Sequence, residues 1–341
     1  MKMANLYRIK WWLLGLCAVC ALVGIALWVS ASRPGSLPVA LEKITIALPT
    51  QPSAGPMFVA LAQGLFRKHG LDVTSQVHEL GMGGLNSVLE NKADLVAVAD
   101  TPIMFKVMKG EKIAIVCSIA NSRRVTAIVA RKDRGISNIR DLAGKTIGLT
   151  MGSNMQFLVD MTLLANNIPV TAVTTVNLKP DEIVDALQSG RVDAVPAWHP
   201  YLAVLQQKMG AGVVSLYGDD MYRFRFNLVG RQDYVATHPA TVRKVVAALS
   251  EAMQFIRNDP AAAKEIVGKF IHMDKAMLDK VFDPADFELK LDQSLLLALD
   301  DQTRWAIKNG LVEGDVVPNY LDYIYFDALQ DVKPDAVTMI H

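Results

Sequence analysis

Short apolar runs alternate with helical patterns along most of this chain, and the alternation starts twice. In the first series, residues 43–48 alternate like a strand, residues 57–69 have the periodicity of a helix, and residues 71–78 are predicted to form the next strand. A second series starts near residue 139 and ends near residue 216. Strands that alternate with helices are typical of an α/β fold with mostly parallel strands. The sequence therefore predicts two α/β units in succession.

A weak internal repeat supports this division. Asp94 and Asp193 each follow a helix end and a turn with a basic residue, and each precedes a short apolar run that is predicted to be a buried strand. Each of these runs leads to a proline, Pro102 in the first series and Pro200 in the second. Two similar α/β lobes are the simplest explanation of the repeat.

The C-terminal part of the chain has a different pattern. From Pro239 onward the periodicity is helical, and the predicted helices lack clusters of site-type residues. We therefore expect them to serve as packing helices. They cover residues 241–257, 260–270, 275–282, 293–309 and 319–330.

Apolar residues are most concentrated at the start of the chain. Residues 11–30 contain no charged residue and follow three basic ones, a pattern typical of a secretory signal or a membrane anchor. We predict that residues 1–31 are a signal peptide cleaved after Ala31, with retention as an inner-membrane anchor as the alternative, and that residues 32–41 are a linker. In both cases the rest of the chain is expected to be periplasmic or otherwise extracytoplasmic.

Charge and composition argue against several kinds of function. The 35 Lys and Arg residues balance 34 Asp and Glu residues, so the chain has no electrostatic footprint for nucleic acid. Cys117 is the single cysteine after the apolar leader, and its apolar neighbours predict a buried core residue. The six histidines lack metal-ligand spacing, and there is neither a P-loop nor a nucleophile elbow. We therefore expect no metal, no cofactor and no enzymatic activity.

The most specific stretch is residues 141–153, with the sequence DLAGKTIGLTMGS. Its last two residues, Gly152 and Ser153, are predicted to open a helix with free N–H groups. Such a helix end stabilises a negative ligand group by about 0.3–1 kcal/mol. The glycine cluster at residues 81–84 offers a second helix start of this kind, with a tight turn that needs positive φ as the alternative.

Taken in order, these motifs resemble the solute-binding proteins of nitrate/sulfonate/taurine-type ABC importers, which have the type II periplasmic binding protein fold. The resemblance covers about residues 42–260. The segments that carry it are GLFRKHGLDV at 64–73, the glycine turn before Leu85, KADLV at 92–96 with Thr101-Pro102, the stretch at 141–153, Trp198-His199-Pro200-Tyr201 and RFNLVG at 225–230.

The resemblance implies two α/β lobes that close like a Venus flytrap on a ligand in the cleft between them. Lobe one would contain residues 42–128 and 226–341, and lobe two residues 129–225. The protein would be a monomer that captures a small, anionic organic solute and delivers it to the permease subunits of an ABC transporter in the inner membrane. The cleft residues that the resemblance picks out are Thr50, Gln51, Gly83, Gly84, Thr101, Ser153, Asn154, Trp198 and His199.

Arginines near the proposed lobe crossings are further candidates. Arg123, Arg124, Arg223 and Arg225 flank the crossings, and a guanidinium that faces the cleft would pair with a sulfonate or carboxylate. We include Arg223 in the predicted site. A solvated surface position is the alternative for each of them.

One residue departs from the family pattern, and it bears on the solute. Taurine and sulfonate binders typically have Trp-Asp-Pro-Tyr where this chain has Trp198-His199-Pro200-Tyr201, and a histidine cannot pair with the taurine ammonium as an aspartate does. A ligand with an acidic or neutral group near His199 fits better. Micromolar affinity needs about 8 kcal/mol, and small ligands gain at most about 1.5 kcal/mol per heavy atom, so an organic solute larger than nitrate is expected.

Two other functions remain open from the sequence. A retained apolar helix would fit a membrane-anchored solute sensor. Thiamine-pyrimidine-related binding proteins and enzymes share the fold, but the enzymes carry a cysteine-rich cluster that one exported cysteine cannot supply, and they are cytosolic.

Overall fold

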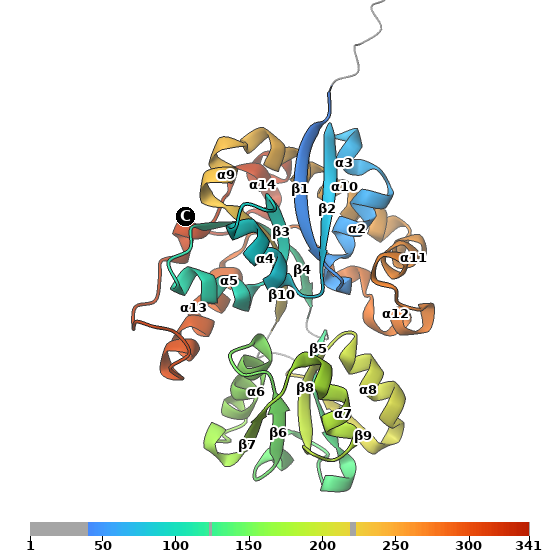
Figure 1. The fold of residues 1–341 in the computed structure, drawn as a ribbon, viewed down its shortest axis with the longest axis vertical. Helices are drawn as coiled ribbons and strands as arrows, with labels where there is room; N and C mark the ends of the chain where they lie inside the picture. The colour runs from blue at the N-terminus through green and yellow to red at the C-terminus, as the bar shows by residue number, and fades with distance from the viewer. Residues whose placement is uncertain (1–39, 123–124, 219–222, 341) are drawn as a thin grey trace, which may run out of the picture. The chain divides into compact units, whose positions relative to one another are not determined.

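The computed structural model describes residues 40–122, 125–218 and 223–340 (Figure 1). The predicted signal peptide or anchor and nearly all of the linker lie outside the described residues, as do Arg123 and Arg124. Residues 41–341 form one compact unit. None of the described helices combines the length and the apolar composition that a membrane span requires.

The first sheet contains β1 (Glu42–Pro49), β2 (Leu71–His78), β3 (Leu95–Ala99), β4 (Ile113–Ser122) and β10 (Phe224–Arg231). Their order in the sheet is β2-β1-β3-β10-β4. β1 is parallel to β2 and β3, whereas β10 is antiparallel to β3 and β4. Every residue of β3 is buried, so that central strand is a continuous apolar run instead of an alternating one.

The second sheet contains β5 (Thr126–Arg131), β6 (Thr146–Leu149), β7 (Thr174–Asn177), β8 (Ala194–Trp198) and β9 (Val213–Leu216). Their order is β7-β6-β8-β5-β9, with β6 parallel to both of its neighbours and β5 antiparallel to β8. This is the same arrangement as in the first sheet. Residues 126–128, which the sequence-based boundary assigns to lobe one, pair in the second sheet.

The two aspartates of the sequence repeat make the same pair of hydrogen bonds in the two sheets. The Asp94 carboxylate accepts a hydrogen bond from the Thr45 N–H at 2.7 Å, and the Asp94 N–H donates to the Thr45 carbonyl at 2.9 Å. Asp193 does the same with Thr146, at 2.9 Å and 2.8 Å. Each aspartate thus connects the residue before β3 or β8 to the neighbouring strand, and the sequence repeat corresponds to a structural one.

Helices connect the strands of both sheets, which confirms the predicted α/β class. α4 and α5 directly follow strands of the first sheet, and α6 and α8 follow strands of the second sheet. These connecting helices are α2 (Gly55–Ala62), α3 (Leu65–Lys68), α4 (Gly81–Leu89), α5 (Asp100–Met108), α6 (Asn154–Ala165), α7 (Ile183–Gln188) and α8 (Tyr201–Met209).

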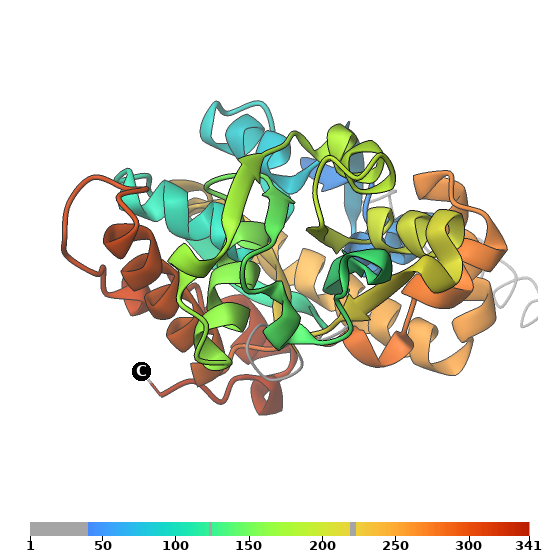
Figure 2. The same cartoon turned by 90° about the horizontal axis from the view of Figure 1, so that it is seen from below.

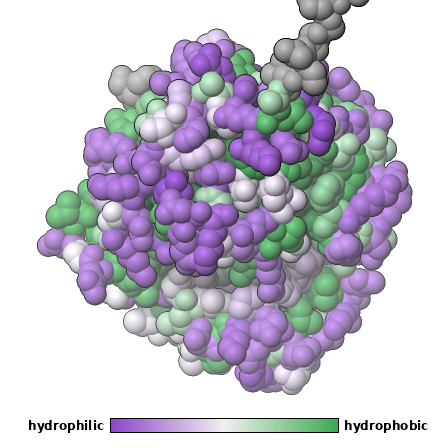
Figure 3. All heavy atoms as spheres, turned by 45° about the horizontal axis from the view of Figure 1, so that its top comes forward, coloured by the Kyte–Doolittle hydropathy of each residue, from purple (hydrophilic) through white to green (hydrophobic). Residues whose placement is uncertain are grey.

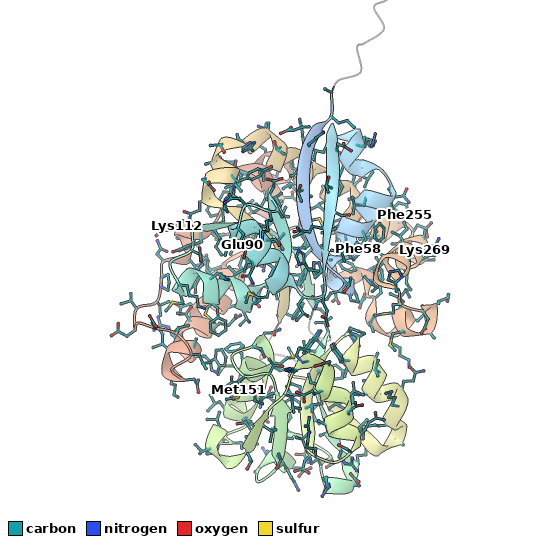
Figure 4. All side chains as sticks on the ribbon, viewed as in Figure 1. Phe58, Glu90, Lys112, Met151, Phe255 and Lys269 are labelled. Carbon is teal, nitrogen blue, oxygen red and sulfur yellow. The ribbon has the colours of Figure 1, made fainter. Side chains whose placement is uncertain are left out.

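The C-terminal part forms α9 (Gln232–Thr237), α10 (Pro239–Asn258), α11 (Pro260–Ile271), α12 (Lys275–Val281), α13 (Gln293–Lys308) and α14 (Asp327–Val332). Several of these helices pack on the first sheet and its helices. Phe58 of α2, labelled in Figure 4, stacks on Phe270 of α11 with ring centroids 5.0 Å apart. Figure 2 shows the orange α11–α12 region and the red α13 on opposite sides of the second-sheet elements.

One predicted helix is wrong. Residues 319–330 form a short 3-10 turn at Tyr320–Tyr323 and then α14, with an extended segment between them. The Tyr325 N–H donates to the Ile115 carbonyl at 2.9 Å, and Ile324 forms a β-bridge with Ile115. The chain therefore leaves the helical conformation to pair with β4, which helical periodicity alone cannot indicate.

Candidate functional site

A cavity of about 270 Å³ is lined by residues from elements of both sheets. The first-sheet elements contribute the turn after β1 and the first turns of α4 and α5, and the second-sheet elements contribute the loop before α6 and the end of β8. Its polar lining residues are Gln51, Thr101, Thr150, Ser153 and Asn154. Its larger apolar lining residues are Leu80, Met82, Val98, Pro102, Phe105, Met151, Met155, Pro180, Trp198, Phe224 and Phe226.

Half of the residues predicted from the sequence lie on this cavity. They come from widely separated parts of the chain, and the fold brings them together. They are Gln51, Thr101, Ser153, Asn154 and Trp198. Thr50, which precedes Gln51, instead extends the pairing of β1 with β2, because its N–H donates to the His78 carbonyl at 2.9 Å.

Several backbone N–H groups at the starts of α5 and α6 already donate hydrogen bonds to side chains of the protein itself. The Thr101 N–H donates to the carboxylate of Asp100 at 2.9 Å. The Gly152 N–H donates to the side chain of Gln156 at 2.8 Å, and the Met155 N–H donates to the Ser153 hydroxyl at 3.2 Å. The expectation that Gly152 offers a free N–H is therefore wrong, and these hydrogen bonds hold the cavity wall in place through the protein's own groups.

The glycine cluster has a different role at each position. Gly81 and Met82 line the cavity, whereas Gly83 and Gly84 lie further along α4 and do not. A Cβ on Gly84 would lie 2.7 Å from Cγ2 of Val96 and 3.0 Å from Cβ of Ala47. Gly84 therefore allows α4 to approach the sheet closely. Neither Gly83 nor Gly84 has a positive φ, so the tight-turn interpretation is also wrong.

His199 and Arg223 lie away from the cavity. Both line a separate pocket beside the strand crossings, together with Ser122 and Asp286. The His199 side chain is only 6% exposed, and burial lowers the pKa of its imidazole to about 4, so the ring is neutral at pH 7. Burial also raises the pKa of the Asp286 carboxyl to about 6. Arg223 itself is exposed.

Arg225, the other described crossing arginine, does not line the cavity either. It is buried, and its Nη2 donates to the hydroxyl of Ser294 at 3.0 Å. Arg225 therefore holds the start of α13 against the first sheet.

The lining of the cavity is uncharged and mostly apolar. Among the described residues, no side chain that lines it is acidic, basic or a histidine. The rings of Phe224 and Phe226 stack with centroids 5.9 Å apart, and Trp198 packs edge-on against Tyr201 at 5.1 Å. An apolar surface of this kind favours the apolar part of a ligand, and the few polar groups fix its orientation.

Sequence reasoning missed most of the apolar lining. Met82, Phe105, Met155 and Phe226 belong to patterns that also predict an ordinary core, so nothing local marks them. Met151 carried a usable signal, because a large apolar side chain stands in a loop two residues after the end of β6. In the structure it is 47% exposed (labelled in Figure 4).

The described residues offer no metal site and no activated thiol. None of their His, Cys, Asp and Glu side chains cluster in a way that could hold a metal ion. Cys117 is fully buried in β4, and burial raises the pKa of its thiol to about 12. A thiol in such an environment is not a nucleophile at neutral pH.

Several bacterial proteins are similar to this chain in sequence, including one from Brucella abortus and one from Bacillus subtilis. A protein of Brucella abortus (strain 2308) named as a binding protein is 25% identical over 224 residues, which cover 65% of this chain and 69% of that protein. A protein of Bacillus subtilis (strain 168), provisionally named as binding aliphatic sulfonates, is 24% identical over 246 residues, which cover 71% of this chain and 73% of that protein.

Solved structures share the fold. The periplasmic aliphatic sulphonate-binding protein SsuA from Escherichia coli superposes with a TM-score of 0.73 at 20% identity, covering 81% of this chain and 95% of that one. The desulfurization enzyme DszB superposes with a TM-score of 0.67 at 16% identity, covering 86% and 99%. These likenesses confirm the predicted periplasmic binding protein fold, although they do not identify a ligand.

The family of this chain follows from a match between its sequence and a family model. A family model described as NMT1/THI5-like matches residues 51–263, a range that includes every strand of both sheets except β1. Every polar residue that lines the cavity also falls within it. The match covers more than half of the chain, and the chain therefore belongs to the NMT1/THI5-like family.

Proposed function

We propose that this chain is the extracytoplasmic solute-binding component of an ABC importer. The observation that carries the proposal is the cavity, because its lining comes from elements of both sheets and from loops that follow strand ends. The names of the Brucella and Bacillus relatives support a binding role. The proposed partners are a small organic solute and the permease subunits of the transporter.

Two lobes are proposed to close on the solute. Lobe one would contain residues 42–122 and 224–340, and lobe two residues 126–216, because β10 pairs in the first sheet and β5 pairs in the second. A hinge of this kind needs only a few residues between rigid parts to change conformation. The proposed contacts with the solute are made by Gln51, Thr101, Ser153, Asn154 and Trp198.

The cavity suggests a solute with a bulky apolar body. An apolar cavity of about 150 Å³ holds benzene, and this one measures about 270 Å³. A small hydrophilic anion would leave most of the apolar wall in contact with nothing but water. The Ser153 hydroxyl already donates to the Thr150 carbonyl at 2.6 Å. A sulfonate or carboxylate head group would instead accept hydrogen bonds from the side-chain amides of Gln51 and Asn154, with an aryl or branched alkyl body against the Phe and Met side chains.

Isothermal titration calorimetry with a series of sulfonates tests this solute class. Burying an apolar group of the size of a Phe side chain contributes about 1.5–3 kcal/mol, so naphthalene-2-sulfonate should bind about 10- to 100-fold more tightly than methanesulfonate. Nitrate and taurine should bind more weakly still. Equal affinities for methanesulfonate and naphthalene-2-sulfonate would contradict the proposed apolar body.

An enzymatic function is the second candidate, because the desulfurization enzyme DszB shares the fold. The one thiol among the described residues, Cys117, is buried in β4 and does not line the cavity. We therefore propose binding without turnover. A bound sulfonate recovered unchanged after prolonged incubation supports this, whereas release of sulfite or sulfate would establish an enzyme.

The fate of the N-terminal leader decides between a released binding protein and an anchored sensor. We expect mass spectrometry of the exported protein to show a mature chain that begins at Ser32, because small residues precede that bond at residues 29–31. An intact N-terminus in the membrane fraction would instead favour the anchored form.

A further inference from the structure

The C-terminal helices continue beyond the part of the chain that the family model matches. Two of them contact second-sheet elements: α12 contacts α8, and α13 contacts α6 through a buried hydrogen bond. α13 begins 30 residues after the match ends at residue 263. Nε1 of Trp305 in α13 donates a hydrogen bond of 2.7 Å to Oδ2 of Asp160 in α6. Both side chains are nearly inaccessible, at 4% exposure for Trp305 and 6% for Asp160. A buried carboxylate with an indole partner is a specific contact, unlike a surface ion pair.

The other end of α13 is fixed to the first sheet. Arg225 of β10 donates to Ser294 in the first turn of α13, at 3.0 Å. Thr303 is hydrogen-bonded to the hydroxyl of Tyr320, which ties the helix to the segment that pairs with β4. α13 also packs against α5. We therefore expect α13 to move with the first sheet, while Trp305 connects it to α6 of the second-sheet elements.

Both α5 and α6 line the cavity, so α13 bridges two of its walls from outside. α5 contributes Thr101 and Phe105, and α6 contributes Asn154 and Met155. Asp160 lies about one and a half helical turns beyond Met155. In addition, the ring of Phe157 meets Trp305 edge-on, with centroids 5.3 Å apart and an interplanar angle of 74°.

Opening the cavity between α5 and α6 would move Asp160 away from Trp305. The Asp160 carboxylate and the Trp305 indole would then both be exposed to water. The buried hydrogen bond between them therefore exists only while α5 and α6 lie close together. Burial raises the pKa of the Asp160 carboxyl and the indole N–H opposes this rise, which agrees with a carboxylate that depends on its single buried donor. Because this hydrogen bond forms only when α5 and α6 are together, it raises the population of that state relative to the opened one.

We propose that Trp305 and Asp160 form a latch that holds the two lobes together over a bound solute, and that α13 thereby sets how long the solute stays bound. The inference rests on the proposed binding function but adds a positioning role for a helix outside the family match. It goes beyond the expectation that the C-terminal helices serve only as packing helices.

Dissociation kinetics of naphthalene-2-sulfonate test the latch. Trp305→Phe keeps a ring against Phe157 but removes the N–H donor, so the dissociation rate should rise about threefold to tenfold with little change in the association rate. Asp160→Leu should have a similar effect, and the double variant should add little to either single one. Asp160→Asn keeps an acceptor oxygen and should restore slow dissociation. The matched control is Arg304→Ala, because Arg304 is exposed, lies next to Trp305 on α13 and forms its ion pair with Asp300 on the same helix.

A second measurement separates the latch from the binding function. Small-angle X-ray scattering of the ligand-free protein should show a larger radius of gyration in Trp305→Phe than in Arg304→Ala. If no sulfonate binds, the binding proposal fails, while the scattering comparison still decides the latch. Unchanged dissociation rates and unchanged scattering in Trp305→Phe, with only a lower unfolding free energy, would overturn it.

Discussion

Replacing Trp198 by alanine is expected to remove most of the solute-induced stabilisation while the unliganded protein stays folded. Trp198 is the last residue of β8 and lines the cavity. Its backbone pairs with Thr126 of β5 whatever side chain it carries, and its ring is only half-buried. The variant therefore loses a ligand contact, the aromatic contact with Tyr201 and part of the packing against the neighbouring apolar core, while the strand pairing remains.

The size of the effect follows from the usual contribution of a buried tryptophan at a binding site. A loss of about 2 kcal/mol weakens binding about 30-fold. A solute at 100 times the wild-type Kd adds about 2.7 kcal/mol to the wild type, and at that concentration it would add less than about 1 kcal/mol to the variant. Differential scanning fluorimetry with and without naphthalene-2-sulfonate measures both values.

Two variants control this experiment. Trp198→Phe should retain part of the stabilisation, because an aromatic ring remains in the cavity. Leu164→Ala removes an exposed apolar side chain from α6 that does not line the cavity, and it should behave like the wild type. Full solute-induced stabilisation in Trp198→Ala would exclude Trp198 from the site.

Alanine at Asp94 or Asp193 is expected to lower the free energy of unfolding by about 1.5–3 kcal/mol, the usual contribution of a hydrogen bond to a charged group. Each carboxylate accepts a strand N–H, at 2.7 Å from Thr45 or 2.9 Å from Thr146, and that N–H loses its partner in the variant. Because the geometry repeats, the two losses should be similar. Urea unfolding of the two proteins measures them.

Asparagine provides the matched control at both positions. Asp94→Asn and Asp193→Asn keep an acceptor oxygen, so each should cost less than the alanine variant. Asp193 also lies 3.6 Å from Arg134, an exposed ion pair that contributes little. Alanine variants within about 0.5 kcal/mol of the wild type would show that the repeated hydrogen bonds are not needed for stability, since that is the range of ordinary surface substitutions.

The sequence predicts the two sheets well because strand and helix periodicities are local. β1, β2 and β6 lie within a few residues of the predicted ranges. The pairing of β10 between β3 and β4 is a long-range property, and so is the extended segment before α14. No local sequence pattern shows that β10 inserts between β3 and β4, or that the helical periodicity is interrupted before α14.

At the candidate site, too, the sequence motif alone does not show which of two neighbouring residues lines the cavity. Trp198 and His199 are neighbours in sequence, and the family resemblance predicts that both face the ligand. The His199 N–H donates to the Val125 carbonyl and so continues the strand pairing, in which successive side chains point to opposite faces. Trp198 therefore lines the cavity, and His199 lies in the pocket beside the crossings. The alternation of side chains along a strand would have indicated that only one of the two residues can face the cavity.

The surface shown in Figure 3 is mostly polar, with apolar residues scattered among polar ones. Beneath such a surface, Cys117 is sealed inside β4 with a thiol whose pKa is raised to about 12. In a mature chain that begins at Ser32, as proposed, Cys17 and Cys20 would be absent and Cys117 would be the one thiol of the sequence. Maleimide dyes would therefore react only with cysteines introduced on purpose, so one dye on each side of the cavity would turn the protein into a fluorescent reporter of its own solute, without first removing a native residue.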